Sequence, residues 1–307
     1  MEKPAFDPGL TQQYTGTLSR ALNPNGQFNV RRTGATWRDA HPYMFLIGTS
    51  WARFAGALLA AFFVANLFFT ALYLATGVEH LKGAEARSVG SKVLSAFFFS
   101  TDTLTTLGSG SVFPNGIAAN ALAAAEAMTG VAGLALATSL LFGRFSRPSA
   151  RIGFSESMVV APYMGGSSLQ LRTVNRRKND IIELEAKLLL MTAEWVEGRH
   201  LRRYFPLELE RDSVLFMALT WTIVHPIGES SPLYKKTPED LARLQAEFIV
   251  LLKGFDETFG QTVYTRRSYR YDEIEWGARF APAFKVEEEN GDLRLELDRV
   301  GAIERPS

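Results

Sequence analysis

The residues best suited to chemistry in this chain form one short loop, Thr105-Thr106-Leu107-Gly108-Ser109-Gly110. Glycine permits the unusual backbone angles that turn successive carbonyl groups toward one axis, and rings of such carbonyls can replace the water shell of a cation. The loop follows a Phe-rich segment, residues 93–104, which is too short to cross a bilayer. A Thr-x-Gly-x-Gly loop in this position predicts that backbone oxygens line an ion path.

The rest of the chain offers little catalytic chemistry. It contains no cysteine, which excludes disulfides, thiolate metal sites and cysteine nucleophiles. Its histidines show neither metal-ligand spacing nor a nucleophile motif, and no Walker or dinucleotide glycine pattern is present. His225-Pro226 with Glu229, Ser230 and Ser231 could form an acid–base cluster, but the pattern is more typical of a strand end and turn. We therefore expect no enzyme activity and no cofactor.

Two apolar runs, one on each side of the loop, must hold it in place. Residues 54–76 carry no charge, and residues 117–142 have Asn120 and Glu126 as their most polar members. A bilayer core needs about 20 apolar helical residues, so both runs can span a membrane; two buried helices of a large soluble core are the alternative. The expected elements are an outer helix at 52–78, a re-entrant pore helix at 93–105, a filter loop at 106–110 and an inner helix at 117–143.

An ion path needs more than one copy of this chain. Backbone that is not helical is tolerated at membrane depth only inside protein or beside water, so Gly108, Ser109 and Gly110 are expected to face an aqueous axis. Two spans and one loop cannot enclose such an axis. A closed ring of identical subunits can, and four is the number known for carbonyl filters, so the pore interpretation implies a homotetramer.

Basic residues set the orientation of the spans, because Lys and Arg gather on the cytoplasmic side. They lie before the first span and after the second: Arg20, Arg31, Arg32, Arg38, Arg53, Arg144, Arg147 and Arg151. Both termini are therefore predicted to be cytoplasmic. Residues 1–36 are predicted to form a flexible or loosely docked cytoplasmic segment, because residues 1–26 are polar and lack the basic start and apolar centre of a signal peptide. Residues 37–47 are short and aromatic and fit an interfacial helix, with an ordinary juxtamembrane linker as the alternative.

The second span is expected to line the ion path. Residues that recur near one face of this helix are Thr129, Leu134, Thr138 and Phe142. Leu134 and Phe142 are candidate constrictions that close the path by dewetting, and Gly130 is a point where the helix can bend. Lipid-facing or helix-packing roles are the alternative for each. Glu126 and Asp102 are candidates for groups behind the filter, either functional, neutral or paired, and the sequence leaves this choice open.

Beyond about residue 154 the hydrophobic pattern changes to the period of two that half-buried strands show. It is clearest at residues 182–188, and further strand candidates are residues 169–174, 206–210, 214–224, 247–253, 261–267 and 293–297. Thr237-Pro238 begins a short helix at 238–244, with Thr237 as the cap. Many short strands with one small helix favour an antiparallel β-sandwich. Residues 144–307 are thus predicted to form a soluble regulatory domain. The net charge of the whole chain is +1, which implies no bulk attraction to nucleic acid.

Longer motifs occur in both halves. They are A-F-F-F-S-T-D-T-L-T-T-L-G at 96–108, E-A-M-T-G at 126–130, R-F-S-R-P at 144–148, L-T-W-T-I-V-H-P-I at 219–227, S-P-L-Y at 231–234 and S-Y-R-Y-D-E-I-E-W-G-A-R-F at 268–280. Together they resemble the prokaryotic inward-rectifier potassium channels of the KirBac type. The resemblance implies a homotetramer in a bacterial inner membrane, with a central pore, a slide helix at 37–47 and an immunoglobulin-like cytoplasmic β-sandwich.

The resemblance also implies roles for individual residues. Potassium would be the permeant ion, held by the carbonyls of Thr106, Leu107, Gly108 and Ser109. Gly130 matches the inner-helix hinge, and Leu134 and Phe142 match the lower constrictions. Basic residues beside a cytoplasmic leaflet gain about 1 kcal/mol each, and anionic lipid headgroups are expected at Arg38, Arg144, Arg147 and Arg151. Gating by lipids and block by cytoplasmic cations or polyamines are further implications, although the neutral Thr129 gives no clear support for strong polyamine block.

Ser109 departs from the TVGYG-type loop of potassium filters. The aromatic ring at this place packs behind the filter, and losing such a ring costs about 3–5 kcal/mol per site. Leu107 in place of a β-branched residue is a second, milder departure. We therefore predict a reduced selectivity for K⁺ over Na⁺. The alternative class is a non-conducting membrane sensor whose β domain binds a ligand or partner, and a membrane-anchored enzyme is a weaker third.

Overall fold

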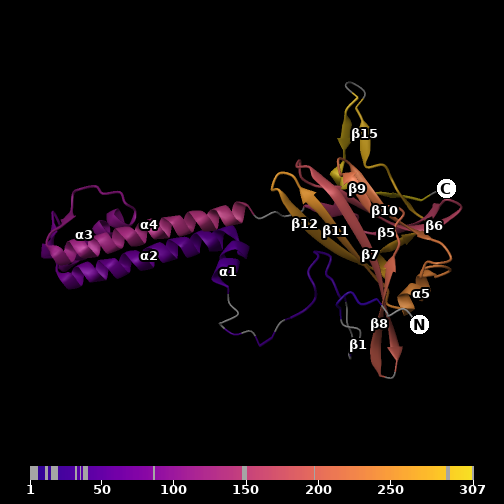
Figure 1. Ribbon diagram of the computed structural model, residues 1–307, viewed down its shortest axis with the longest axis horizontal. Coiled ribbons are helices and arrows are strands. Elements are labelled where there is room, and N and C mark those ends of the chain that lie inside the picture. Colours follow the sequence, from indigo (N-terminus) through magenta and orange to yellow (C-terminus); the bar gives the residue numbers. More distant parts are fainter. Residues whose placement is uncertain are drawn as a thin grey trace. The chain divides into compact units, whose positions relative to one another are not determined.

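The computed structural model describes residues 6–10, 13–14, 20–31, 33–34, 36, 41–85, 87–146, 151–196, 198–287 and 291–305. The chain divides into two compact units, and Figure 1 labels their elements. We name Thr33–Arg147 the helical unit, and Met1–Arg32 together with Pro148–Ser307 the β unit.

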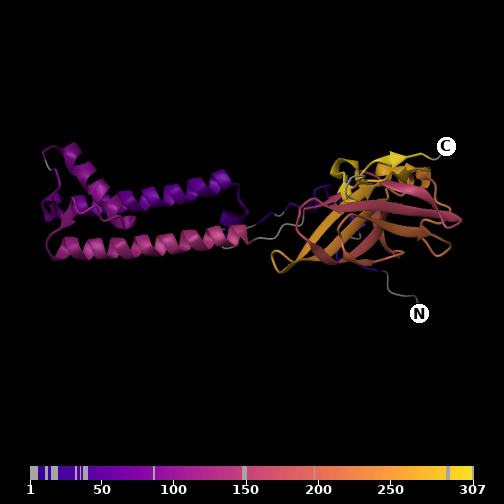
Figure 2. The ribbon, with the colours of Figure 1, turned by 90° about the horizontal axis from the view of Figure 1, so that it is seen from above.

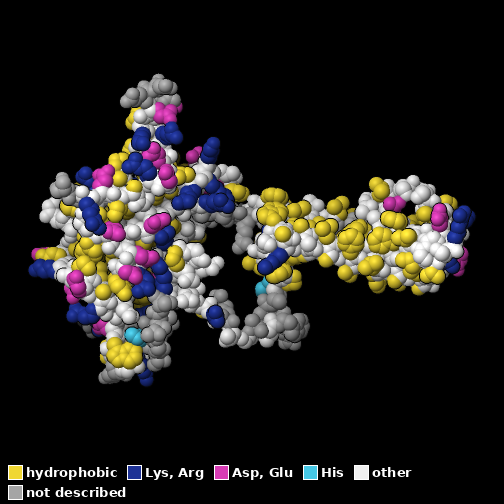
Figure 3. Space-filling view, turned by 180° about the vertical axis from the view of Figure 1, so that it is seen from behind, with side chains coloured by type: hydrophobic (Ala, Val, Ile, Leu, Met, Phe, Trp, Pro, Cys, Tyr) yellow, Lys and Arg dark blue, Asp and Glu magenta, His cyan; other side chains and the backbone are white. Residues whose placement is uncertain are grey.

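The helices of the helical unit, over its described residues, are α1 Pro42–Gly48, α2 Trp51–Thr76, α3 Val89–Leu104 and α4 Ile117–Phe145. α2 and α4 run alongside each other, and α3 contacts both near one end (Figures 1 and 2). In the described part of the chain, α2 and α4 are the two helices long and apolar enough to cross a membrane. Hydrophobic side chains cover much of the visible face of this unit, as Figure 3 shows.

Local signals set the ends of these helices. Ser88 and Ser91 form a reciprocal capping box, so α3 begins at Val89 rather than at residue 93. α2 ends at Thr76 because Gly77 takes a φ of 100°, a conformation that side-chain-bearing residues rarely adopt. α1 begins with Pro42 at its first position. The expected start of this helix at residues 37–40, including Arg38, lies outside the described residues.

Aromatic side chains of α2 and α3 form the core of the helical unit. Tyr73 and Phe99 pack edge to face with ring centroids 5.0 Å apart, and Phe69 and Leu104 join the same cluster. The much longer α4 buries only Ala119 and Glu126 among its described residues. Most side chains of α4 therefore face away from the core of their own chain.

The β unit contains two main sheets over its described residues, which confirms the predicted β-sandwich. The larger sheet has the order β1-β8-β7-β11-β12, with β9 on β7: β1 Gln13–Tyr14, β7 Ile181–Val196, β8 Arg199–Leu207, β9 Ser213–Phe216, β11 Glu247–Asp256 and β12 Gln261–Arg270. The smaller has the order β10-β6-β5-β13, with β4 on β6: β4 Ile152–Phe154, β5 Met158–Tyr163, β6 Gly166–Asn175, β10 Thr220–Ile227 and β13 Ile274–Trp276. Pairing is antiparallel except between β13 and β5.

Shorter elements complete the two units. The helical unit has the strand pair β2 Leu81–Lys82 and β3 Phe113–Pro114. The β unit has β14 Arg279–Phe280 with β17 Ile303–Glu304, and β15 Phe284–Val286 with β16 Leu293–Leu295. Its helix α5, Pro238–Arg243, begins with a capping box between Thr237 and Asp240.

The two sheets of the β unit share one hydrophobic core. Leu184 and Phe248 reach it from the larger sheet, and Leu171 and Ile223 reach it from the smaller; all four are fully buried. Residues 214–224, expected as one strand, belong to two, because β9 pairs with β7 in the larger sheet and β10 pairs with β6 in the smaller. The chain thus changes sheets between Phe216 and Thr220. Of the strand expected at 206–210, only residues 206 and 207 are in a strand, as the end of β8.

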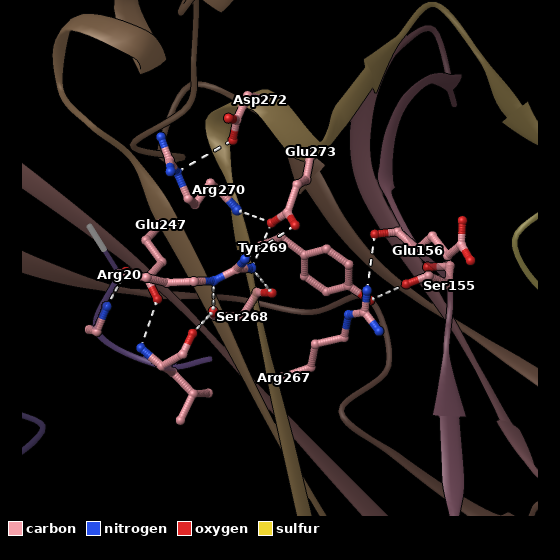
Figure 4. Close-up of polar contacts among 12 residues, drawn as sticks. Arg20, Ser155, Glu156, Glu247, Arg267, Ser268, Tyr269, Arg270, Asp272 and Glu273 are labelled. Atoms are coloured by element: carbon pink, nitrogen blue, oxygen red, sulfur yellow. Dashed lines mark hydrogen bonds and ion pairs between the residues drawn. The ribbon is translucent and has the colours of Figure 1, made fainter. Parts of the chain in front are cut away.

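The N-terminal strap, which we define as residues 20–28, is docked on the β unit, which is one of the two arrangements that the sequence leaves open. Glu247 is almost fully buried, and its carboxylate accepts the main-chain amides of Ala21 at 2.9 Å and Leu22 at 3.1 Å. Arg20 pairs with Glu273 at 2.6 Å and donates to the Ser268 carbonyl at 2.5 Å (Figure 4). Composition alone could not show this, because the partners of the strap lie more than 200 residues away in sequence.

Candidate functional site

The loop after α3 alternates in backbone handedness. Thr106, Gly108 and Gly110 have positive φ angles of 59°, 58° and 74°, whereas Leu107 and Ser109 lie outside the positive region. A positive φ at a residue other than glycine costs about 1–3 kcal/mol, so the neighbours of Thr106 must hold it. An alternating backbone of this kind allows successive carbonyl groups to point toward the same side.

Main-chain hydrogen bonds tie this loop to the end of α3. The amide of Thr106 donates to the Thr103 carbonyl at 3.1 Å, and the amides of Leu107 and Gly108 donate to the Asp102 carbonyl at 2.9 and 3.4 Å. Among the described residues, no main-chain donor is bonded to the carbonyl groups of residues 106–109. The main-chain amides of the loop are therefore bonded to α3, whereas the carbonyl groups of residues 106–109 remain available as acceptors for a ligand.

Ser109 anchors the same loop through its side chain. Its hydroxyl donates to the Asp102 carboxylate and lies 3.1 Å from the Ser111 hydroxyl. Asp102 thus holds the loop twice, once through its carbonyl and once through its carboxylate. A side-chain hydrogen bond ties the loop to α3 at the position where TVGYG-type filters carry a packed aromatic ring.

Glu126 joins three helices behind this loop. The side chain is fully buried, and it accepts hydrogen bonds from the Tyr73 hydroxyl of α2 at 2.6 Å and the Ser100 hydroxyl of α3 at 2.5 Å. Beside it, the Asn66 amide donates to the Thr101 hydroxyl at 2.7 Å. The structure therefore places Glu126 in a polar network whose members are paired. Sequence reasoning missed Tyr73 and Ser100, for which single polar residues in apolar runs were the available signal.

Gly130 is required where α4 crosses the end of α3. A Cβ atom at this position would lie 2.2 Å from the Leu104 carbonyl oxygen, which real contacts do not allow. α4 continues through Gly130 as one helix from Ile117 to Phe145. The structure thus gives Gly130 a packing role in addition to the hinge that the sequence predicts.

The predicted pore-lining face of α4 is exposed within one chain. A cavity of about 430 Å³ brings Thr106 of the loop together with Thr129, Gly130 and Leu134. Thr138 and Phe142 lie beyond this cavity, toward the end of α4, and are also exposed. The Thr129 hydroxyl donates to the Ala125 carbonyl at 2.8 Å, so its proton is directed at its own helix.

The arginines expected to hold lipid headgroups have different surroundings. Arg151 is exposed, and Arg38 and Arg147 lie outside the described residues. The guanidinium of Arg144 donates to the carbonyl groups of Leu46, Ile47 and Thr49. These acceptors belong to the end of α1 and the turn that follows it.

The candidate acid–base cluster around His225 makes hydrogen bonds within the β unit. His225 lies in β10, with Nδ1 2.5 Å from the Glu208 carbonyl oxygen and Nε2 2.8 Å from the Ser231 hydroxyl. Burial lowers the pKa of His225, against a smaller opposing effect of the Glu208 carbonyl. A buried imidazole with both nitrogens engaged by a strand and a turn fits the strand-end interpretation.

Comparison with known proteins covers both units. A family model described as "Inward rectifier potassium channel C-terminal domain" matches residues 152–305, and one described as "Ion channel" matches residues 60–147. The inward rectifier potassium channel Kirbac3.1 of Paramagnetospirillum magnetotacticum is 39% identical over 269 residues, which cover 86% of this chain and 89% of that protein. The ATP-sensitive inward rectifier potassium channel 12 of Mus musculus is 31% identical, over 93% of this chain and 72% of that protein.

Proposed function

Because the chain belongs to the family of inward rectifier potassium channels, we propose that four copies enclose a pore in which residues 106–110 form the selectivity filter. Potassium ions pass through it down their gradient, held in turn by the carbonyls of Thr106, Leu107, Gly108 and Ser109. The observation that carries this proposal is the loop itself. Its φ angles alternate in sign, its amides are bonded back to α3, and its carbonyls are left as acceptors.

The surface of α4 supports an assembly of several copies. Among its described residues only Ala119 and Glu126 are buried within one chain, while Leu134 and Phe142 are 67% and 72% exposed. Such a helix needs lipid or further protein around it. In a fourfold ring, Thr129, Leu134, Thr138 and Phe142 would line the axis, and the two large apolar side chains would close it by dewetting.

The membrane setting follows from the same arrangement. α2 and α4 would cross a bacterial inner membrane, with both termini and the β unit in the cytoplasm. Anionic lipids would meet the exposed Arg151, Arg147 four residues before it, and Arg38 in the segment that precedes α1. Strong block by cytoplasmic polyamines would need acidic groups on the pore face, and Thr129 is neutral.

Ser109 would lower the selectivity for K⁺ over Na⁺. An aromatic ring behind a filter fixes its diameter by packing, whereas Ser109 holds the loop through one hydrogen bond to Asp102. A hydrogen bond of this kind contributes about 1–3 kcal/mol when one partner is charged, compared with about 3–5 kcal/mol for a buried ring. The filter would therefore be held less tightly in each of the four subunits.

Flux of K⁺, Na⁺ and Rb⁺ into proteoliposomes, with and without anionic lipid, tests the proposal. We expect K⁺ and Rb⁺ flux with measurable Na⁺ entry in the wild type, and a higher K⁺ over Na⁺ ratio in Ser109→Tyr. Strict K⁺ selectivity that Ser109→Tyr leaves unchanged would contradict the role given to Ser109. A membrane sensor without a pore is the second candidate, and an intact tetramer that shows no flux under activating lipid conditions would favour it.

A further inference from the structure

The charged group of Arg144 lies at the ends of two helices. Arg144 is in the last turn of α4, and its two terminal nitrogens reach carbonyl groups in the last turn of α1 and at the residue that follows it. One nitrogen lies 2.5 Å from the Leu46 oxygen and 3.2 Å from the Ile47 oxygen, and the other lies 2.8 Å from the Thr49 oxygen. Carbonyls at a helix end have no partner within their helix and carry partial negative charge, so one cation serves both helix ends.

Aromatic side chains enclose the same guanidinium group. Its central carbon lies 4.5 Å from the centre of the Trp51 ring and 4.6 Å from that of Phe54, both in the first turn of α2. Trp51 also packs on Phe145, the last residue of α4, with ring centroids 5.2 Å apart. A planar fork can stack on rings and donate to several carbonyls at once, which a lysine ammonium cannot reproduce.

α1 depends on α4 for its position. It has seven residues, and none of its side chains is buried, whereas isolated helices shorter than about 12–15 residues are marginal in water. Gly143 lets α1 come close, because a Cβ there would lie 3.0 Å from the Tyr43 hydroxyl and 3.1 Å from the Ile47 Cδ1 atom. Arg144 and Gly143 therefore form the part of α4 against which α1 packs.

We propose that Arg144 is a positioning residue that locks α1 and the start of α2 to the end of α4, and that it is not a ligand for lipid headgroups. The inference rests on the proposed function, in which Phe142, two residues earlier in α4, closes the pore. The lock fixes the end of α4 that carries this constriction. Lipid then acts through other basic residues, because the terminal nitrogens of Arg144 are already engaged by carbonyl groups.

The experiment compares the full-length wild type with Arg144→Lys, which keeps the charge, and Arg144→Gln, which removes it. Arg53→Gln is the matched control, because Arg53 is an exposed basic residue in the first turn of α2. Each protein is placed in vesicles with an increasing fraction of anionic phospholipid, and Rb⁺ flux gives a maximal rate and a lipid fraction for half-maximal rate. Hydrogen exchange measured by mass spectrometry reports on the amides of residues 43–49.

If Arg144 is a positioning residue, Arg144→Lys and Arg144→Gln should have similar effects on amide exchange and on flux. Losing the forked hydrogen bonds and the ring contacts should speed amide exchange in α1 by about tenfold in both variants. The maximal flux should change by about fivefold or more in both, while the lipid fraction for half-maximal flux shifts by less than about twofold. Arg53→Gln should leave exchange in α1 as in the wild type.

Other outcomes separate the two roles. Wild-type behaviour of Arg144→Lys, together with a higher lipid requirement of Arg144→Gln, would assign the residue to headgroups and overturn the lock. Unchanged exchange in α1 in both variants would overturn it as well. If the wild type shows no flux while both variants speed exchange in α1, the proposed channel function fails and the lock stands.

Discussion

The two units of this protein differ in how much of their surroundings the chain itself supplies. The β unit buries Leu184, Phe248 and Ile223 between its own sheets, so one copy completes its core. In the helical unit, α4 buries little more than Glu126 among its described residues. The β unit should therefore fold within one chain, whereas the helical unit needs lipid or further protein to cover it.

The two units also differ in what their buried polar side chains contact. In the helical unit the buried polar groups, such as Glu126 with Tyr73 and Ser100, connect α4 to α2 and α3. In the β unit Glu247 and Glu273 hold a distant segment of the chain, the N-terminal strap. The first set holds the candidate site in shape, and the second set fixes where the chain begins its path toward α1.

The largest expected effect comes from removing core volume in the β unit. Phe248→Ala should lower the free energy of unfolding of this unit by about 3–5 kcal/mol, because it leaves a cavity in a closed core. Denaturant unfolding of the full-length protein, followed by the signal of the β unit, measures this. Phe216→Ala is the control, since Phe216 is 74% exposed. An equal effect of both substitutions would contradict the comparison between a core and a surface.

A glycine pair tests the packing of the helical unit. Gly130→Ala should push α4 from the end of α3, at a cost of about 1–3 kcal/mol, and should strongly reduce Rb⁺ flux. Gly133→Ala in the same helix meets nothing within 4 Å and should keep flux close to that of the wild type. Flux assays on the two variants, with the oligomer checked by size-exclusion chromatography, test whether flux depends on the close contact at Gly130. Equal flux in both would show that the contact with Leu104 is unimportant.

The strap should loosen when its buried acid is neutralised. Glu247→Gln keeps the shape but loses the charge that receives two main-chain amides, which should cost about 1–3 kcal/mol. Hydrogen exchange in residues 20–28 should become faster, while exchange in β7 should stay as in the wild type. Glu185→Gln is the control, because it removes an exposed partner of Lys253. Unchanged exchange in the strap would show that other contacts hold it.

The smallest expected effect is a pH dependence of the β unit through His225. Burial lowers the pKa of this histidine in the folded state, whereas the unfolded chain has a value of about 6.5. The unfolded state therefore binds the proton more readily, and stability is full above about pH 6.5 and falls as the pH is lowered. Unfolding free energies at pH 8 and pH 5.5 measure the loss, and His225→Gln should reduce the difference between them. A larger loss in that variant would point to another group.

The sequence predicted the features that depend on local patterns. Uninterrupted apolar runs predicted α2 and α4, and the period of two with turn residues predicted the β-sandwich, because helices and strands each impose their own spacing. Residues that meet from distant segments were not predicted. The change of sheet between β9 and β10 depends on which strands accept each segment, and a pattern of buried residues does not identify that partner.

By itself, the sequence determined two spans, a glycine loop between them, a β domain after them and an unusual serine in the loop. Only the tertiary structure showed that Asp102 holds Ser109, that Gly130 lies against Leu104 and that Arg144 contacts carbonyl groups near the end of α1. The reason is physical. Hydrophobic periodicity is a property of neighbouring residues, whereas a hydrogen bond or a close approach depends on where folding brings two distant groups together.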